Sequence, residues 1–180
     1  TVTETQPGAY LDGKDTAGST GGTVANDVLS AITLTAGANS VNNNFGELLP
    51  ASLGNRLWLD ADSDGQQDLG ESGVVGATVT LIGGGADGVI NGIGDTFATT
   101  TTGTNGEYRF NNLNAGERYQ VQFAAPTGTV FTQANVSGNT LDAVDSDANT
   151  ATGKTQIVTL AQGEYNDTLD AGVIVLRPGI

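Results

Sequence analysis

Five carboxylates, one glycine and one glutamine form a regular pattern within a single twelve-residue stretch. Carboxylates stand at positions 1, 3, 5, 9 and 12, glycine at 6 and glutamine at 7, which are Asp60, Asp62, Asp64, Asp68, Glu71, Gly65 and Gln66. This is the ligand order of a calcium loop, in which the residue at position 7 offers its backbone carbonyl and the glycine permits a sharp turn. The alternative is a solvated acidic turn, but carboxylates this close repel one another unless a cation lies among them.

The segments beside this loop predict strands rather than helices. Residues 53–59 alternate apolar and polar side chains and contain Trp58, and residues 77–82 are rich in β-branched side chains. An EF-hand would need an amphipathic helix on each side. We therefore expect the loop to connect two strands and to stiffen a β-sandwich, rather than to move helices as a calcium sensor does.

Two other stretches are weaker candidates for calcium binding. The first is glycine-rich and repeats a polar oxygen every four residues, at Asp87, Asn91 and Asp95; its alternative is a flexible hairpin tip. The second places Asp145 and Asp147 two residues apart, so that they could chelate an ion with Asp142 or a distant loop; its alternative is a solvated turn. Asp170, at the start of the last strand, is a further candidate ligand. We expect two to three Ca²⁺ ions in the complete module.

Composition limits the possible fold classes and the classes of binding partner. The chain is rich in Gly, Thr, Asn, Asp and Val and has no long helical periodicity, which predicts an all-β fold. Its net charge of −14 argues against nucleic acid and anionic membranes as partners, and no stretch predicts membrane insertion. There is no cysteine for disulfides, and no histidine, the commonest general base and the usual zinc ligand.

Three segments near the start of the chain match three near its end, in the same order. The pairs are 2–7 with 121–126, 32–37 with 158–163, and 44–46 with 170–172. We interpret residues 1–49 as the last three strands of a repeat, at 2–7, 29–34 and 44–48, with a long loop from 9 to 27. Residues 50–176 are then one complete module of about seven strands, and residues 177–180 the start of a linker or the chain end.

Three strands alone would leave an apolar face and open edges. We therefore expect residues 1–49 to be completed by another segment or chain. The predicted partners are neighbouring copies of the chain or adjacent repeats, joined head to tail by strand complementation.

Several motifs together resemble the SdrD B-like domain, a repeat of bacterial surface and secreted proteins. They are Gly54-Asn55-Arg56-Leu57-Trp58-Leu59-Asp60-Ala61-Asp62-Ser63-Asp64-Gly65, Glu71-Ser72-Gly73-Val74-Val75-Gly76-Ala77, Gly106-Glu107-Tyr108-Arg109-Phe110-Asn111-Asn112-Leu113 and Leu169-Asp170-Ala171-Gly172. The resemblance implies an Ig-like or prealbumin-like β-sandwich that binds several calcium ions and is strung in rows as a stalk. It also implies ligand roles for Asp60, Asp62, Asp64, Asp68, Glu71, Asp145, Asp147 and Asp170.

Some related adhesin domains cross-link a strand lysine to a strand asparagine. Here the first strand of the full module carries Arg56 instead, and Lys14 and Lys154 lie in or beside predicted loops. We expect no such bond.

The pattern favours an extracellular structural module, stiffened by calcium, in a surface-protein stalk or a head-to-tail fibre. Extracellular calcium would keep even weak sites filled. The alternative is an adhesin module that binds protein or carbohydrate, although the single tryptophan offers no stacking surface. The sequence shows no pairing of a nucleophile with a base, so we do not expect an enzyme.

Overall fold

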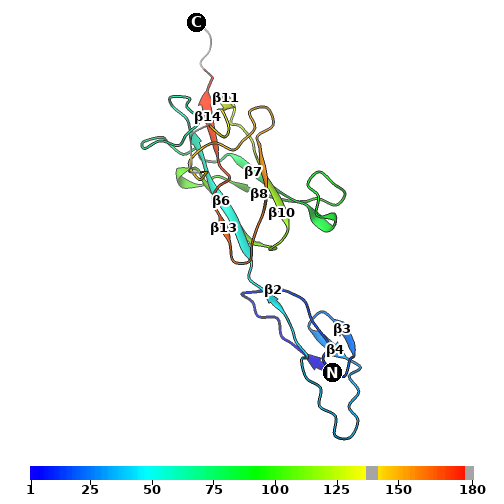
Figure 1. Cartoon of the computed structure of the whole chain (residues 1–180). Helices are drawn as coiled ribbons and strands as arrows, with labels where there is room; N and C mark the ends of the chain where they lie inside the picture. Colours follow the sequence, from blue (N-terminus) through cyan, green and yellow to red (C-terminus); the bar gives the residue numbers. More distant parts are fainter. Residues whose placement is uncertain (137–141, 177–180) are drawn as a thin grey trace. The chain divides into compact units, whose positions relative to one another are not determined.

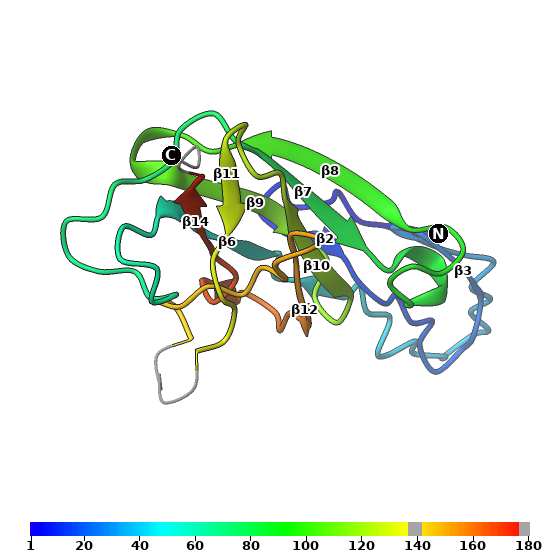
Figure 2. The ribbon, with the colours of Figure 1, turned by 90° about the horizontal axis from the view of Figure 1, so that it is seen from above.

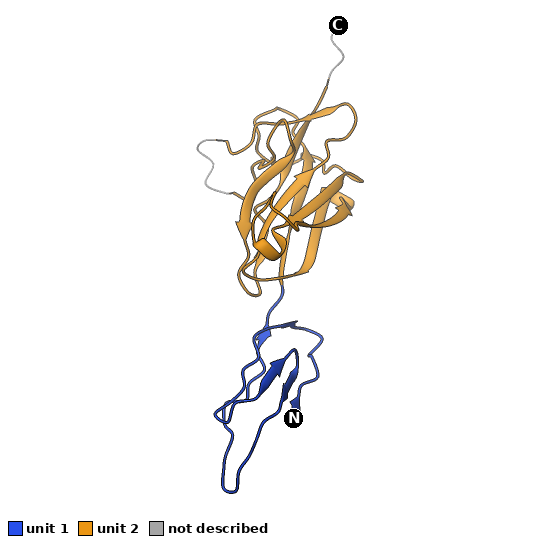
Figure 3. Ribbon diagram, turned by 90° about the vertical axis from the view of Figure 1, so that its right-hand side faces the viewer, with its two compact units in different colours: residues 1–50 blue, residues 51–180 orange. Residues whose placement is uncertain are grey.

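The computed structural model describes residues 1–136 and 142–176, and these form strands joined by turns, with two short 3₁₀ helices. This confirms the predicted all-β fold class. The chain divides into two compact units, Thr1–Pro50 and Ala51–Ile180, which Figure 3 colours separately. No helix in the described residues is long and apolar enough to cross a membrane.

The second unit is a sandwich of two sheets (Figures 1 and 2). One sheet has four antiparallel strands, in the spatial order β12 (Lys154–Thr159), β10 (Arg118–Phe123), β7 (Thr78–Gly83) and β8 (Thr96–Thr101). The other contains β11 (Thr129–Phe131), β14 (Ala171–Val175), β6 (Ala51–Leu59), β13 (Tyr165–Asn166) and β9 (Glu107–Leu113). The 3₁₀ helices are η1 (Gly85–Asp87) and η2 (Thr104–Gly106).

The core fills the space between the sheets with alternate side chains of each strand. One sheet contributes Val79, Leu81, Val121 and Phe123, and the other Leu53, Leu57, Tyr108, Phe110, Ala171 and Val173, all of them buried. The rings of Tyr108 and Phe123 meet across the two sheets, edge to face, with centroids 5.3 Å apart. This two-sheet core is the predicted β-sandwich.

Strand β6 positions the calcium-loop sequence at one end of the sandwich. It is the longest strand and pairs with β9 on one side and, in parallel, with β13 and β14 on the other. Where β6 ends, the Asp60 N–H donates to the Val173 carbonyl of β14 at 2.9 Å. The loop therefore begins inside the sheet, next to the last strand of the unit.

The first unit contains five short strands rather than the expected three. A three-stranded sheet has the order β1 (Val2–Thr3), β4 (Val28–Ser30), β3 (Thr23–Ala25), and a second pair joins β2 (Leu11–Asp12) to β5 (Glu47–Leu48). Strands β2 and β3 lie in the segment expected to be a long loop. Its Gly, Asp and Thr content indicates turns locally, but Leu11 pairs with Leu48, a distant contact that local pattern cannot show. The strand expected at 29–34 stops at Ser30, because Ala31 has a φ of +51°.

Candidate metal centre

The stretch from Asp60 to Glu71 folds as a compact loop closed by its first and last carboxylates. Asp60 is 1% exposed, and its two oxygens accept hydrogen bonds from the N–H groups of Ser63 (2.6 Å) and Gly65 (3.0 Å). The Glu71 carboxylate accepts from the N–H groups of Ala61 (2.7 Å) and Asp68 (2.9 Å). The first and last carboxylates of the loop thus both accept hydrogen bonds from backbone N–H groups in its interior.

The five carboxylates of this loop gather into two groups that share Asp62. One comprises Asp60, Asp62 and Glu71, the other Asp62, Asp64 and Asp68, and within each group one oxygen per residue lies within 4.8 Å of the others. The structure therefore brings together every carboxylate that the sequence assigned to this loop. Gln66 uses its backbone N–H to donate to Asp64 at 2.8 Å.

Position 65 requires glycine both for its backbone conformation and for lack of space for a side chain. Its φ is +83°, and a Cβ there would lie 2.5 Å from the Val136 side chain and 2.7 Å from the Gln133 carbonyl oxygen. The tight turn at position 6 is thus fixed by the segment packed against it.

The acidic segment 142–147 is bonded directly to this loop. The Gln67 N–H donates to the Val144 carbonyl (2.7 Å), the Ser146 N–H donates to the Gly65 carbonyl (3.0 Å), and Gln66 and Asp145 form an antiparallel bridge. Two stretches predicted separately from the sequence therefore form one acidic region.

Asp145, Asp147 and Asp170 are the buried part of this region. They are 5%, 3% and 0% exposed. One Asp147 oxygen accepts from the Asp170 N–H at 2.8 Å, and the other accepts from the Gln156 amide at 2.8 Å. One Asp170 oxygen accepts from the Asn55 amide at 2.6 Å. One oxygen of Asp170 and one of Asp145 are buried with no hydrogen-bond partner in the part of the chain that the structure describes.

Burial and mutual repulsion make these three carboxyls hard to ionise. Desolvation, followed by the charges of Asp147, Asp145 and Asp142, raises the pKa of Asp170 to about 10. Desolvation raises the pKa of Asp147 to about 7, although hydrogen bonds from the Asp170 backbone and Gln156 oppose it. Desolvation, followed by Asp142, also raises the pKa of Asp145. A cation among them would favour the charged forms.

This donor set fits calcium. All donors are hard oxygens, they come from a tight loop and a buried cluster bonded to it, and two buried carboxylate oxygens lack a partner. An unpaired buried carboxylate oxygen is costly, and Ca²⁺ would satisfy it. Asp142 acts here as a neighbouring charge that raises the pKa of Asp170.

The loop around Asp87, Asn91 and Asp95 is arranged differently. Asp87 accepts from the N–H groups of Val89 (3.0 Å) and Ile93 (2.9 Å), and Asp95 accepts from the Asn91 N–H at 2.8 Å. The Asn91 side-chain oxygen accepts from the Lys154 ammonium at 3.0 Å. These carboxylates close their own loop, and the asparagine oxygen already faces a cation, although one Asp95 oxygen is buried with no partner among the described residues. This loop has only two carboxylates, so it cannot form a group of three; among the described residues, the buried Asp145, Asp147 and Asp170 do not form a group with oxygens within 4.8 Å of one another either.

One carboxylate group in the first unit was missed from the sequence. Asp12, Asp15 and Asp27 have oxygens within 4.8 Å of one another, and Asp15 accepts from the Asp27 N–H at 2.9 Å. Asp12 and Asp15 stand three residues apart, but Asp27 is brought in only by the turn between β3 and β4. The spacing alone gave no signal for that turn.

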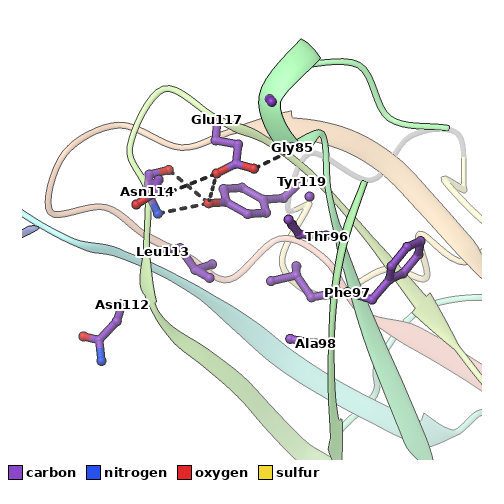
Figure 4. A pocket seen from close by; sticks show the side chains of 12 residues that line it. Gly85, Thr96, Phe97, Ala98, Asn112, Leu113, Asn114, Glu117 and Tyr119 are labelled. Atoms are coloured by element: carbon purple, nitrogen blue, oxygen red, sulfur yellow. Dashed lines mark hydrogen bonds between the residues drawn. The ribbon is translucent and has the colours of Figure 1, made fainter. Parts of the chain in front are cut away.

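A groove beside β8 has no catalytic arrangement (Figure 4). The Tyr119 hydroxyl donates to Glu117 at 3.0 Å and accepts from the Asn114 N–H, and Glu117 also accepts from the Gly85 N–H at 3.2 Å. Burial and the Glu117 carboxylate raise the pKa of Tyr119, so its proton stays on. The polar groups of the groove bind one another and fasten the β9–β10 turn to η1.

A family profile and sequence relatives place the second unit in a known family. The SdrD B-like domain profile matches residues 51–173. Over 121 residues, or 67% of this chain, the sequence is 36% identical to serine-aspartate repeat-containing protein D of Staphylococcus aureus strain Newman, and it is 35% identical over 116 residues to protein C of that strain. The matched regions span 8% and 11% of those proteins. The shaft pilin SpaA from Lactobacillus rhamnosus GG aligns over 72% of this chain and 52% of its own, with a TM-score of 0.39 and 12% identity.

The family match confirms the resemblance found in the sequence. The matched residues contain the whole calcium-type loop and the buried aspartates. The matched family is one of structural β-sandwich domains and not an enzyme family. The chain belongs to the family of SdrD B-like domains.

Proposed function

We propose that this chain is an extracellular structural module whose second unit is stiffened by calcium. It would serve in the stalk of a surface protein or as a subunit of a head-to-tail fibre. Membership of the SdrD B-like family supports the structural role. The acidic region supports the calcium role, with Asp60, Asp62, Asp64, Asp68 and Glu71 as ligands in the loop and Asp145, Asp147 and Asp170 as ligands in the buried cluster.

One observation carries the calcium proposal. The loop is hydrogen-bonded to the segment that holds the buried cluster, and that cluster contains partnerless carboxylate oxygens on Asp145 and Asp170. Ions bound here would connect the end of β6, the 142–147 segment and the start of β14. Without ions, the same region concentrates repulsion in a unit that has no disulfide.

The expected stabilisation is large for a small domain. An ion that binds only the folded state adds RT ln(1+[L]/Kd), which is about 2.7 kcal/mol per site at a hundredfold excess over Kd. Two such sites would supply a large share of an ordinary total of roughly 5–15 kcal/mol. Extracellular calcium is abundant enough to fill weak sites, which favours a location outside the cell.

We propose adjacent repeats as the partners of the first unit, with further copies of the chain as the alternative. Among the strands that the structure describes, β1 pairs only with β4 and β5 only with β2, so the first unit presents strand edges to a neighbour. A neighbouring segment that adds strands there would join modules head to tail.

An adhesin role receives no support from the tryptophan. Trp58 is 0% exposed, so it cannot stack against a sugar ring at the surface. We therefore place the structural role first.

A calcium titration by calorimetry tests the proposal. We expect the native chain to bind two to three ions and Asp60→Asn with Glu71→Gln to lose binding at the loop. Asp167→Asn, which removes one exposed carboxylate near the site, should bind as the native chain does. A native chain that takes up no calcium at millimolar concentration would refute the proposed sites.

A further inference from the structure

The first unit repeats the hydrogen-bonding pattern of one half of the second unit. Strands β1 and β4 pair Thr3 with Val28, as β10 and β12 pair Gln122 with Lys154. In the same places, the Glu4 N–H donates to the Asp27 carbonyl (3.0 Å), and the Phe123 N–H donates to the Gly153 carbonyl (2.9 Å). The two carbonyl-bearing residues share positive φ angles of +57° and +67°.

The second strand pair of each unit also corresponds residue by residue. Strands β2 and β5 pair Leu11 with Leu48 and Asp12 with Glu47, whereas β11 and β14 pair Val130 with Ile174 and Phe131 with Val173. Just beyond, the Gly13 N–H donates to the Gly46 carbonyl at 2.8 Å, and the Thr132 N–H donates to the Gly172 carbonyl at 3.0 Å. The family profile does not reach this unit, yet its backbone follows the same register.

The correspondence shows which edges of the first unit are open. In the second unit, β14 also pairs with β6 through Ala171–Leu57 to Val173–Leu59, and β10 also pairs with β7 through Tyr119–Gly83 to Phe123–Val79. Strands β5 and β1 have no such second partners in the first unit. The missing elements are therefore the counterparts of β6 and β7.

Side-chain exposure agrees with a missing cover. Val2 is 43% exposed, whereas its counterpart Val121 is 0% exposed. Leu34 is 60% exposed, whereas its counterpart Leu160 is 1% exposed. These apolar residues stand where the complete sandwich has its core.

The face of the first unit that lacks a covering sheet also has acidic side chains at positions where the complete sandwich has apolar ones. Glu4, Asp12 and Glu47 stand at the positions of Phe123, Phe131 and Val173. One carboxylate oxygen each of Glu4, Glu47 and Asp27 is buried with no hydrogen-bond partner among the described residues, while the other Glu47 oxygen accepts from the Gln6 amide at 2.6 Å. The face expected from the sequence to be apolar is therefore mixed, and whatever covers it must bring hydrogen-bond donors as well as apolar side chains.

We propose that residues 1–50 form the C-terminal half of an SdrD B-like sandwich that takes, as its other half, a segment with the strand order of residues 51–113. The first strand of this segment lies parallel to β5 and its second antiparallel to β1. Unlike β6, it carries a basic side chain facing Glu4 and Glu47. A second copy of this chain is a poor donor, because its residues 51–113 already pair with its own β10, β13 and β14.

The proposal extends the structural role proposed above but does not depend on calcium. Its test is hydrogen exchange, followed by mass spectrometry, on the full chain with an added copy of residues 51–119 fused to Thr1. This join gives Val2 the place that Val121 has. Two versions are compared: one with the native first unit, and one with Glu4→Phe, Asp12→Phe and Glu47→Val, which restores the apolar core of the second unit.

We expect amides in residues 1–12 and 41–49 to exchange about tenfold or more slowly in the restored version than in the same variant without the added copy. With the native first unit, the added copy should slow amide exchange by a smaller factor. Leu59→Arg in the added copy places a basic side chain opposite Glu47 and should make this factor larger. Leu57→Pro and Leu81→Pro in the added copy should abolish both effects. Unchanged exchange in the restored version, with residues 118–123 still protected, would overturn the proposal. The same result should be obtained in chelator and in calcium, so failure here leaves the calcium proposal standing.

Discussion

Asp147 and Asp170 are joined by a reciprocal pair of hydrogen bonds. The Asp147 N–H donates to the Asp170 carbonyl at 2.9 Å, and the Asp170 N–H donates to the Asp147 carboxylate at 2.8 Å. The pair fixes two buried carboxylates beside each other, together with Asp145. Such an arrangement carries a large electrostatic cost that a bound cation would remove.

Replacement of Asp170 by asparagine should distinguish the electrostatic destabilisation that this buried carboxylate causes without metal from its contribution to calcium binding. Asp170→Asn removes one buried carboxylate, so we expect the metal-free chain to melt at a higher temperature than native. We also expect calcium to raise the melting temperature of this variant by less than it raises that of native. Asp167→Asn, with the same change of charge at an exposed position, should alter neither quantity. An undiminished calcium effect in Asp170→Asn would exclude this residue as a ligand.

Gly65 should be far less tolerant of substitution than Gly70. Gly65→Ala meets both the positive φ and contacts with Val136 and Gln133, so we expect a loss of about 1–3 kcal/mol in the free energy of unfolding. Gly70 has a φ of +101° but open space around its Cβ position, so Gly70→Ala should cost only the backbone strain. Urea unfolding of both variants measures the difference. Equal losses would mean that contact with the neighbouring segment does not shape the loop.

Metal-free stability should fall as pH rises. Unfolded aspartate titrates near 3.8, whereas the folded pKa is about 7 for Asp147 and about 10 for Asp170. Between pH 4 and 7 the folded chain therefore holds more protons at both groups than the unfolded chain does, and between 7 and 10 it does so at Asp170. The free energy of unfolding in chelator should thus be greater at pH 5 than at pH 8.

The doubly substituted chain provides the control for this pH dependence. Asp147→Asn with Asp170→Asn removes both raised pKa values, so its stability in chelator should vary less with pH. Urea midpoints at pH 5 and pH 8 give the comparison. Native stability that rises from pH 5 to pH 8 in chelator would contradict the assigned pKa shifts.

The loop from 87 to 95 should contribute to stability without changing the calcium response. Asp87→Asn weakens its hydrogen bonds to the Val89 and Ile93 N–H groups, which predicts a loss of about 1 kcal/mol. The number of ions in a calorimetric titration should stay as in native. A variant that binds one ion fewer would show instead that this loop is the second calcium loop considered from its sequence.

The features that could be predicted were those determined by residues close together in the sequence. The spacing from Asp60 to Glu71 specified all five carboxylates that the fold gathers, and the alternation around Trp58 specified the strand before them. The link between Gln66 and Asp145 was not predictable, because two loops distant in sequence meet there. The same limit hid the Asp12, Asp15 and Asp27 group, which depends on a turn and on distant strand pairing.

The loop at 87–95 shows the opposite limit. Its regularly spaced oxygens suggested ligands, but the same oxygens can accept hydrogen bonds from their own backbone, and spacing alone does not decide between the two uses. The acids at Glu4, Asp12 and Glu47 were equally hidden. Only the register identifies them as core positions.

Thermal unfolding followed by the fluorescence of Trp58 tests the central claim most directly. This single tryptophan is fully buried in β6, two residues before Asp60, so its emission reports on the second unit. If two sites each add about 2.7 kcal/mol, millimolar calcium should raise the melting temperature by on the order of 10 °C or more over chelator. Equal melting temperatures in calcium and in chelator would contradict the account.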